Sequence, residues 1–570
     1  MNGLLQSLMP NLIVAPILLP LVTAALMLLL GEPRRVLKAG INVLSCAIGL
    51  AVSITLLVWV DSHDAAGAVG VYLPSNWEVP FGIVLAVDRL SAMMLLLSSA
   101  IGLASVLFAV ARWDRAGVHF HPLFQIQLMG LNGAFLTADL FNLFVFFEVL
   151  LAASYGLLLH GSGRARVSAG LHYIAVNLLA SSLFLIGVAV LYGATGTLNM
   201  ADLAQKIPMV EDDDRALMHA GAAILAIAFL AKAAMWPLNF WLAPAYAAAG
   251  APVAALFALM TKVGVYAVLR LWTLLFSSGA GASALFGGDA LVVGGLATLA
   301  FGAIGVLASQ HLGRLAGFSI IVSSGTLLAA IGFGQAALTA GAMYYLLSSS
   351  LALAALFLLN ELIERSRQIE EEVRLPDDEG DSPPFAAELL RRASDTNLDD
   401  DQEALIGKAI PAAMAFLGLS FIACTLLIAG FPPLAGFTGK LAIPSALPDP
   451  MGLGGPSAAA PMTPAAWTLF TLLIVSGLAA MLALTRAGIR FFWAPQDRPV
   501  PRLRIIECLP VAVLVGACMA LTVRAEPVMH YTRAAADALH QPAQYIATVM
   551  SARPVPAPAA QKLPIEGGLR

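Results

Sequence analysis

The 570-residue sequence has few charged residues, and this shortage excludes an ordinary soluble protein. Charged residues make up 12% of the chain and hydrophobic residues 59%, whereas soluble domains carry roughly 25% charged residues. The formal net charge of −4 is small. The sequence has no basic face with interleaved aromatic residues, so it predicts no nucleic-acid partner.

Cysteines are also scarce. The four that are present show no CxxC pair and no histidine at ligand spacing: Cys46, Cys424, Cys508 and Cys518. They lie scattered in apolar segments, where cysteine acts as a small core residue. We therefore expect no iron–sulfur cluster, no metal site and no disulfide framework.

Motifs for nucleotide, redox or covalent chemistry are missing as well. Gly439 and Lys440 are followed by Leu441, and the upstream glycine spacing does not fit a phosphate-binding loop. No GxGxxG opens a strand–helix unit, and no HExxH motif or nucleophile elbow is found. The sequence predicts no cofactor and no enzyme, so an ion gradient or a partner subunit must drive whatever the protein moves.

Long apolar runs fill the chain instead. A bilayer-spanning helix needs about 20 residues, and runs of this kind fall at 4–30, 39–60, 80–110, 121–138, 139–160, 167–193, 217–246, 249–274, 288–309, 314–333, 338–362, 405–442, 464–489 and 505–523. We predict an all-α polytopic membrane protein with about fourteen transmembrane helices. The first run lacks a basic n-region and is too long for a signal peptide, so it is expected to be a retained helix.

Basic residues alternate between the loops. They follow the first, third, fifth, ninth, eleventh and thirteenth runs, as at Arg34, Arg112, Arg164 and Arg314. The intervening loops are acidic or neutral. The positive-inside rule then places both termini outside the cytoplasm. Residues 363–404 form a long polar segment, predicted to be a cytoplasmic linker. Residues 526–570 are predicted to form a surface helix and a Pro/Ala-rich tail.

Four ionisable residues fall inside the apolar runs: Glu148, Lys232, Lys262 and Lys440. A charged group at mid-bilayer costs roughly 2.5–3.5 kcal/mol on insertion scales. An acid and a base facing each other offset much of this cost, so we expect Glu148 to pair with an intramembrane lysine. Structural alternatives stay open: the glutamate as a helix-packing group bonded to serine or tyrosine, and the lysines snorkelling to the headgroups.

Prolines interrupt two of the lysine-bearing runs. Pro237 follows Lys232 by about one turn, and Pro432 and Pro433 precede Lys440. Proline removes a backbone donor and frees an upstream carbonyl, and broken membrane helices occur where they line a cavity. Paired interrupted helices in two halves of a transporter indicate an ion site. A plain proline kink is the alternative.

Other polar residues lie inside the runs and are individually typical of helix–helix hydrogen bonding: Asn142, His172, Asn177, Ser181, Ser182, Ser319, Ser323, Ser324, Ser348, Ser349 and Ser350. Among them, His172 is a candidate proton relay.

Three stretches carry a family resemblance: FNLFVFFEVLLAASYGLLLHG, LAKAAMWPLNFWLAPAYAAAGAPVAALFALMTKVGVYAVLRL and GFPPLAGFTGKL. Together they resemble the antiporter-like membrane subunits shared by Mrp-type multisubunit Na⁺/H⁺ antiporters, respiratory complex I and membrane-bound hydrogenases. LFVFFEVLLAASYGLL, MTKVGVYAVLRL and the C-terminal EPVMHYTRAAADALHQPAQYIATVM look most like the D-type subunits of Mrp antiporters.

The resemblance implies fourteen helices with two inverted five-helix repeats and breaks in the seventh and twelfth helices. The chain then divides into 1–120 (three helices), 121–274 (first repeat), 287–362 with 405–492 (second repeat around the linker), 505–525 (last helix) and 526–570. It also implies a multi-pass protein of the bacterial cytoplasmic membrane. The implied partners are an A-type homologue and small membrane subunits, and the implied ions are Na⁺ and H⁺.

The resemblance further implies that Glu148, Lys232, Lys262 and Lys440 form a proton-translocating chain along the membrane midplane. The family pattern predicts a histidine in the eleventh helix, where Ser348 stands here. Serine cannot hold a proton at that station, so water or a neighbouring group must bridge it.

Two other functions remain open at this stage. The chain is either a subunit of a secondary antiporter, which we favour, or a redox-driven proton-pumping subunit of a complex I-like or hydrogenase complex, or a passive scaffold subunit. The sequence does not distinguish the cation or the stoichiometry.

Overall fold

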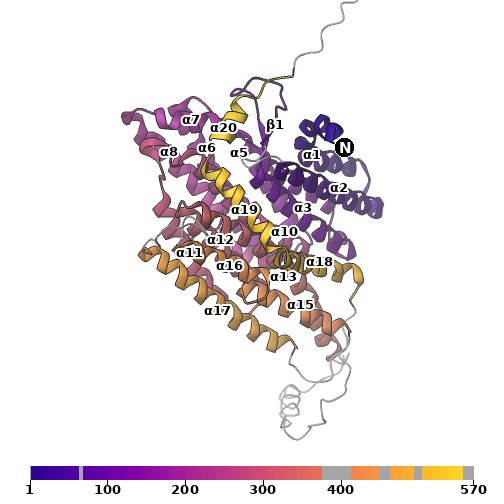
Figure 1. Ribbon diagram of the computed structural model, residues 1–570. Coiled ribbons are helices and arrows are strands. Elements are labelled where there is room, and N and C mark those ends of the chain that lie inside the picture. Colours follow the sequence, from indigo (N-terminus) through magenta and orange to yellow (C-terminus); the bar gives the residue numbers. More distant parts are fainter. Residues whose placement is uncertain (1, 63–68, 375–411, 449–461, 493–502, 556–570) are drawn as a thin grey trace, which may run out of the picture.

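The computed structural model describes residues 2–62, 69–374, 412–448, 462–492 and 503–555 (Figure 1). The helices are α1 (Asn2–Leu29), α2 (Arg35–Asp61), α3 (Arg89–Ala111), α4 (Phe120–Leu136), α5 (Leu140–Leu158), α6 (Arg164–Thr195), α7 (Met200–Lys206), α8 (Asp212–Lys232), α9 (Leu242–Ala248), α10 (Ala251–Leu275), α11 (Gly288–Ala308), α12 (Leu312–Gly332), α13 (Ala336–Arg374), α15 (Ala412–Ala429), α16 (Ala435–Ala446), α17 (Pro464–Phe492), α18 (Ile505–Val523), α19 (Ala525–His540) and α20 (Ala543–Met550). The strands are β1 (Gly70–Tyr72) and β2 (Leu85–Val87).

The prediction of an all-helical polytopic membrane protein is confirmed. Within the described residues, thirteen helices are long and apolar enough to cross a membrane. The expected fourteenth is α4, which has only 17 residues and therefore spans about 25 Å at 1.5 Å per residue. The short turn expected before α5 is present, because the Asp139 side chain accepts a hydrogen bond from the Asn142 amide at 2.8 Å. Burial raises the pKa of the Asp139 carboxyl, which the amide bonds of Asn142 and Phe141 oppose.

One predicted boundary is wrong. The third run was expected to be helical from residue 80, but α3 begins at Arg89 and the preceding residues form an antiparallel β1–β2 hairpin with Gly70 opposite Val87. The apolar residues 84–87 are buried in and next to β2, whereas Phe81 and Ile83 before them are exposed. Asp88 ends the hairpin and starts the helix, since its side chain accepts from the Ser91 amide at 2.9 Å.

Two five-helix units follow one another in the chain. The first consists of α4, α5, α6, the pair α8/α9 and α10, and the second of α11, α12, α13, the pair α15/α16 and α17. The first begins at Phe120, near the end of α3 that carries Arg112 and Trp113. Helix α10 starts against Trp113, which a Cβ at Gly250 would approach to 2.9 Å. The second unit begins at Gly288, which approaches Trp272 near the other end of α10. The two units therefore start on opposite sides of the bundle, as inverted repeats do.

The fourth helix of each unit is interrupted. After α8 ends at Lys232, a non-helical segment with a cis Trp236–Pro237 bond leads to α9. After α15 ends at Ala429, a segment with a cis Pro432–Pro433 bond leads to α16. The predicted breaks are thus present, and each removes backbone hydrogen bonds beside a lysine.

The C-terminal segment differs from a free surface helix. Helix α19 packs along α13, with Thr532, Ala535, Ala536 and Leu539 buried. Helix α20 continues to α7 and the hairpin, near the top of Figure 1. There the Asn76 side chain exchanges two hydrogen bonds with the backbone of Val555. We call residues 525–555 the strap. Helix α13 also continues to Arg374, beyond the predicted start of the linker at 363; residues 375–411 and 556–570 lie outside the described part.

Helix α10 lies at the centre of the bundle. Every residue of its apolar window is buried, and it packs against α13, α8 and α3. Gly264 allows this close approach, because a Cβ there would lie 2.6 Å from the backbone nitrogen of Ala233 at the end of α8. The lysine-bearing parts of α8 and α10 are therefore neighbours.

Candidate functional site

Glu148 lies on α5 and is half-buried. Its Oε1 accepts a hydrogen bond from the Ser181 hydroxyl of α6. The direct ion pair with a lysine that the sequence suggested is not formed. A hydroxyl that faces the carboxylate from the adjacent helix stabilises the charge in its place.

Lys232 occupies the last position of α8 and is 7% exposed. Its Nζ lies 5.0 Å from the centroid of the Phe147 ring, next to Glu148 in α5. The Glu148 carboxylate acts on this ammonium electrostatically, at longer range than a direct contact. A ring face at this distance is a favourable contact for a cation.

Lys262 lies in the middle of α10 and is fully buried. Its Nζ has no hydrogen-bond partner among the described residues. An isolated buried ammonium is costly, so a charged Lys262 would need a partner that the described residues do not supply in this arrangement. Lys262 lies two residues before Gly264, where the backbone of α10 approaches Ala233 at the broken end of α8.

Lys440 lies in α16, immediately after the second break, and is 8% exposed. Its Nζ donates hydrogen bonds to the carbonyl oxygens of Ile428 and Ala429, both at 3.0 Å. These carbonyls belong to the last turn of α15, which the break leaves without helical donors. The negative end of this half-helix therefore holds the ammonium.

One small cavity lies beside Lys232 and another beside Lys440, the two lysines at the helix breaks. The cavity at Lys440 has a volume of about 20 Å³ and is lined by polar groups of Ser319, Tyr345, Ser349 and Ser476 among apolar side chains. The cavity at Lys232 has a volume of about 10 Å³. A water molecule needs about 10–15 Å³ by this measure, so the Lys440 cavity has room for one and the Lys232 cavity is at the limit.

Two predicted relay residues lie away from these cavities. The Ser348 hydroxyl bonds to the Tyr345 carbonyl of its own helix at 3.2 Å, and its neighbour Ser349 lines the Lys440 cavity instead. His172 is exposed on α6, where its Nδ1 lies 2.9 Å from the Ser168 carbonyl oxygen. Tyr345 and Ser476 were not singled out from the sequence, because a tyrosine or serine in an apolar run is typical of helix packing.

His172 lines a groove of about 670 Å³ between α6, α9, α12 and α13. The groove also contains His311, Arg314 and Glu364, at the end of the bundle that carries the basic loops. Trp241 forms part of its wall and also part of the wall of the Lys232 cavity. Trp241 is therefore the lining residue that the groove and the cavity at the first break have in common.

The comparisons with known proteins agree with this architecture. Residues 137–377 match the family described as NADH:quinone oxidoreductase/Mrp antiporter, TM. The chain is 53% identical over 544 residues to the D-type subunit of a probable K(+)/H(+) antiporter from Rhizobium meliloti strain 1021, covering 95% of this chain and 98% of that one. It is 32% identical over 548 residues to the D-type subunit of the Na(+)/H(+) antiporter from Alkalihalophilus pseudofirmus, covering 95% and 100%.

A solved structure extends the likeness to the fold. A chain of the Mrp complex from Dietzia sp. DQ12-45-1b has a TM-score of 0.73 and 26% sequence identity, covering 96% of this chain and 99% of that one. The matched relatives are antiporter subunits over nearly their whole length, so the chain is a transporter subunit rather than an enzyme. The chain therefore belongs to the family of D-type subunits of Mrp antiporters, within the membrane-subunit family shared with NADH:quinone oxidoreductase.

Proposed function

We propose that this chain is the proton-translocating subunit of a multisubunit monovalent cation/proton antiporter. The observation that carries the proposal is the Lys440 ammonium, bound by the carbonyls of Ile428 and Ala429 that the helix break releases. A buried cation at a broken helix has no use in packing that an apolar residue would not serve better. It suits a site that gains and loses a proton.

The first repeat supplies the corresponding parts. Lys232 sits at the break of α8 within reach of the charge on Glu148, and Lys262 lies beyond it in α10. Burial favours the neutral lysine, and an approaching carboxylate favours the ammonium. Movement of Glu148 between Ser181 and Lys232 would therefore load and unload Lys232, passing protons toward Lys262 and Lys440. Pro237, Pro432 and Pro433 maintain the two helix interruptions at which Lys232 and Lys440 lie.

The groove at His172 is the proposed entrance on the side of the basic loops. Trp241 is the only side chain that lines both this groove and the Lys232 cavity among the described residues, so its rotation would admit water to the lysine. Basic loops lie in the cytoplasm by the positive-inside rule. We therefore assign this entrance to the cytoplasmic side and both termini to the opposite side of the bacterial membrane.

The exchanged cation is proposed from the relatives. The relative with 53% identity belongs to a probable K(+)/H(+) antiporter and the one with 32% identity to a Na(+)/H(+) antiporter. Both ions belong in the assay. The proposed partners are an A-type homologue and small membrane subunits. Because these would act together in one complex, the assay requires the whole assembly.

The test uses the complete complex in membrane vesicles with a pH-sensitive dye. Glu148→Gln and Lys232→Met should each abolish proton movement on addition of NaCl or KCl, while the complex still assembles. Lys206→Gln serves as the control, because it removes a half-exposed lysine that pairs with Asp202 far from the breaks. Normal exchange in either Glu148→Gln or Lys232→Met, at normal protein levels, would contradict the proton chain.

A further inference from the structure

Helix α10 carries three polar side chains on one face. Lys262, Tyr266 and Arg270 are spaced four residues apart, so they lie one above another along the helix. Lys262 is the ammonium at the centre of the bundle that lacks a partner among the described residues. Arg270 lies near the end of α10 that meets the β1–β2 hairpin. This face of α10 therefore extends from the buried Lys262 to Arg270, at the side of the bundle opposite the basic loops.

Arg270 is paired with Asp88 at this end. Its Nη1 and Nη2 donate to the two carboxylate oxygens of Asp88, each at 2.6 Å, and both side chains are largely buried. Burial acts to raise the pKa of Asp88, but the charge and hydrogen bonds of Arg270 and the Ser91 amide hold it below its ordinary value. The pair is a bidentate charge-assisted contact, the strongest kind of side-chain hydrogen bonding.

Hydroxyl groups continue from this pair into the bundle. Arg270 Nη2 also donates to the Ser91 hydroxyl at 3.2 Å, and that hydroxyl lies 3.3 Å from the Tyr266 hydroxyl. Tyr266 in turn donates to the Phe135 carbonyl at 2.7 Å. Asp88, Ser91 and Tyr266 therefore form a connected series of groups that can accept and donate protons.

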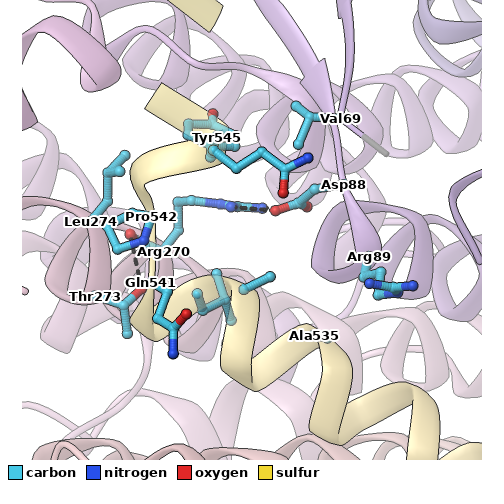
Figure 2. A pocket seen from close by; sticks show the side chains of 13 residues that line it. Val69, Asp88, Arg89, Arg270, Thr273, Leu274, Ala535, Gln541, Pro542 and Tyr545 are labelled. Atoms are coloured by element: carbon cyan, nitrogen blue, oxygen red, sulfur yellow. Dashed lines mark hydrogen bonds and ion pairs between the residues drawn. The ribbon is translucent and has the colours of Figure 1, made fainter. Parts of the chain in front are cut away.

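A cavity of about 40 Å³ lies on the other side of the pair (Figure 2). Asp88, Arg270, Thr273, Gln541 and Gln544 contribute polar groups to it, and its volume exceeds that of a single water site. The strap forms its cover, from Ala535 in α19 to Tyr545 in α20. The Tyr545 ring centroid lies 5.2 Å from the Arg270 guanidinium carbon, so this ring contacts the guanidinium at the same time as Asp88 and can hold it when the pair opens.

We propose that the Asp88–Arg270 pair is the gate of a second proton path, which joins Lys262 to the side of the membrane that bears the hairpin and the strap. This rests on the proposed function, since Lys262 is taken as a proton carrier. When Arg270 moves away from Asp88, a hydronium ion in the cavity transfers its proton to an Asp88 oxygen and is left as water. Asp88 passes this proton to the Ser91 hydroxyl, the Ser91 and Tyr266 hydroxyls each accept one proton and release another, and the neutral Lys262 amine accepts the last to become an ammonium.

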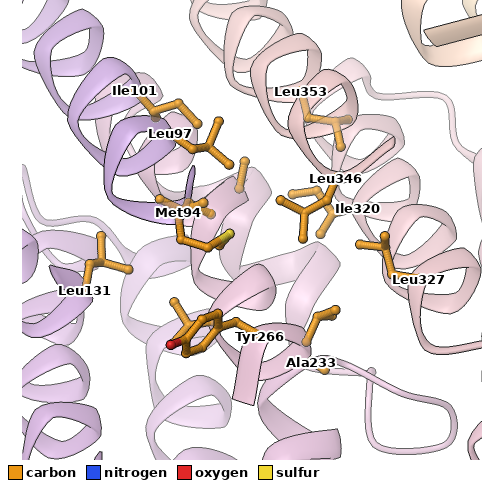
Figure 3. Packing of buried hydrophobic residues seen from close by; sticks show 14 of the residues in the cluster. Met94, Leu97, Ile101, Leu131, Ala233, Tyr266, Ile320, Leu327, Leu346 and Leu353 are labelled. Carbon is orange, nitrogen blue, oxygen red and sulfur yellow. The ribbon is translucent and has the colours of Figure 1, made fainter. Parts of the chain in front are cut away.

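The structure corresponds to the closed state of this path. Lys262 Nζ makes no hydrogen bond to any described residue, so the series ends at Tyr266. Figure 3 shows Tyr266 within an apolar cluster that also contains Met94 and Leu131. The path thus has two interruptions, the ion pair and the missing hydrogen bond between Tyr266 and Lys262. Opening requires the Lys262 side chain to turn toward Tyr266 as well as the release of Asp88.

The competing role for the pair is purely structural, tying the start of α3 to the end of α10. Accessibility to Ag⁺, a small cation that binds thiolates, separates the two roles. A cysteine at Ser91 reports the inner side of the pair, and a cysteine at Thr273 reports the cavity. In the assembled complex, Ag⁺ is added to the hairpin side and the protected thiols are counted by later alkylation, against the parent with its four native cysteines.

The expected result is that Ser91→Cys is unreactive beside the native pair and becomes reactive when Arg270→Gln is added. Thr273→Cys should react in both backgrounds. Lys206→Gln, which breaks the Asp202–Lys206 ion pair at the outer end of α7, should leave Ser91→Cys unreactive. An unreactive Ser91→Cys in the Arg270→Gln background, with Thr273→Cys reactive, would overturn the gate. If Arg270→Gln does not assemble, Asp88→Asn with Arg270→Gln removes both charges and decides the question.

A measurement of passive proton leak identifies the residue at which the path ends inside the bundle. Arg270→Gln should raise passive proton entry from the hairpin side several-fold. Adding Lys262→Met should remove this leak, and adding Lys440→Met should not. A leak that survives Lys262→Met would overturn the assignment of Lys262 as the end point. The Ag⁺ measurement needs no exchange activity, so the gate is decided even if Glu148 and Lys232 prove dispensable for antiport.

Discussion

The ammonium of Lys440 donates a hydrogen bond to the carbonyl oxygen of Ile428 at 3.0 Å, across the break that separates α15 from α16. The two residues are twelve positions apart, so only an interrupted helix brings them together. The contact satisfies a carbonyl that the break releases. Lys262 in α10 has no such contact among the described residues, and this difference between the two lysines leads to the first prediction.

Lys262→Met should stabilise the protein while removing transport. A buried polar group without a hydrogen-bond partner costs about 1–3 kcal/mol; replacing Lys262 by an apolar side chain of similar size removes this cost and leaves no partner atom unsatisfied. Thermal unfolding of the detergent-solubilised complex should shift upward, with antiport lost in vesicles. Lys206→Met is the comparison: it leaves the buried Asp202 carboxylate without its partner, so it should lower the unfolding temperature and leave antiport unchanged. A lower unfolding temperature for Lys262→Met would mean that the amine has a stabilising partner.

Gly430→Ala should impair transport without altering any ionisable group. Gly430 has φ of +78°, and a Cβ there would lie 2.5 Å from Lys440 Cδ. A left-handed backbone costs an L-residue about 1–2 kcal/mol, and the contact would displace the lysine from the Ile428 carbonyl. Gly418→Ala is the matched control, since a Cβ at Gly418 meets nothing within 4 Å. Equal antiport rates in both variants would show that the position of Lys440 is not critical.

Ser181→Ala should slow antiport, and Ser181→Thr should restore most of the rate. The Ser181 hydroxyl is the hydrogen-bond donor to Glu148, and a hydrogen bond to a charged group contributes about 1.5–3 kcal/mol. Its loss changes the balance between the two positions proposed for the carboxylate. Ser182→Ala tests the same helix without this contact, because the Ser182 hydroxyl donates to the Leu178 carbonyl of its own helix. The measurement is the initial rate of proton movement at several cation concentrations.

Docking of the strap should weaken as the pH falls from about 7 to about 5. Burial lowers the pKa of His540, with Asp537 opposing, so the folded state favours the neutral ring. The unfolded pKa of histidine is about 6.5; the stability from a depressed histidine pKa is therefore present above this value and lost below it. The contact at stake is the 2.9 Å hydrogen bond between His540 and Thr339 of α13.

Limited proteolysis of the strap over this pH range measures the effect. His540→Gln should remove most of the pH dependence, whereas His530→Gln should retain it, because His530 is exposed on the same helix. Identical pH profiles for the parent and His540→Gln would assign the dependence, if any, to another group.

The sequence by itself determined the parts of this protein that depend on local chemistry. Apolar runs of bilayer length placed the helices, and the prolines at 237, 432 and 433 placed both breaks, because proline's effect on a helix is local. The four intramembrane charges stood out for the same reason, since an apolar run has few of them. The hairpin was missed because a buried strand and a lipid-facing helix start have the same apolar composition.

Only the tertiary structure decided which groups meet. Ser181 rather than Lys232 contacts Glu148, and Ser349 rather than Ser348 faces the Lys440 cavity, because rotation of one helix against the next sets these contacts. The pairing of Asp88 with Arg270 joins residues 182 positions apart, and no local pattern encodes such a contact. Packing over the whole bundle determines which polar groups share a buried space. The pattern of residues along the sequence does not show these contacts, because they depend on how the helices are placed against one another.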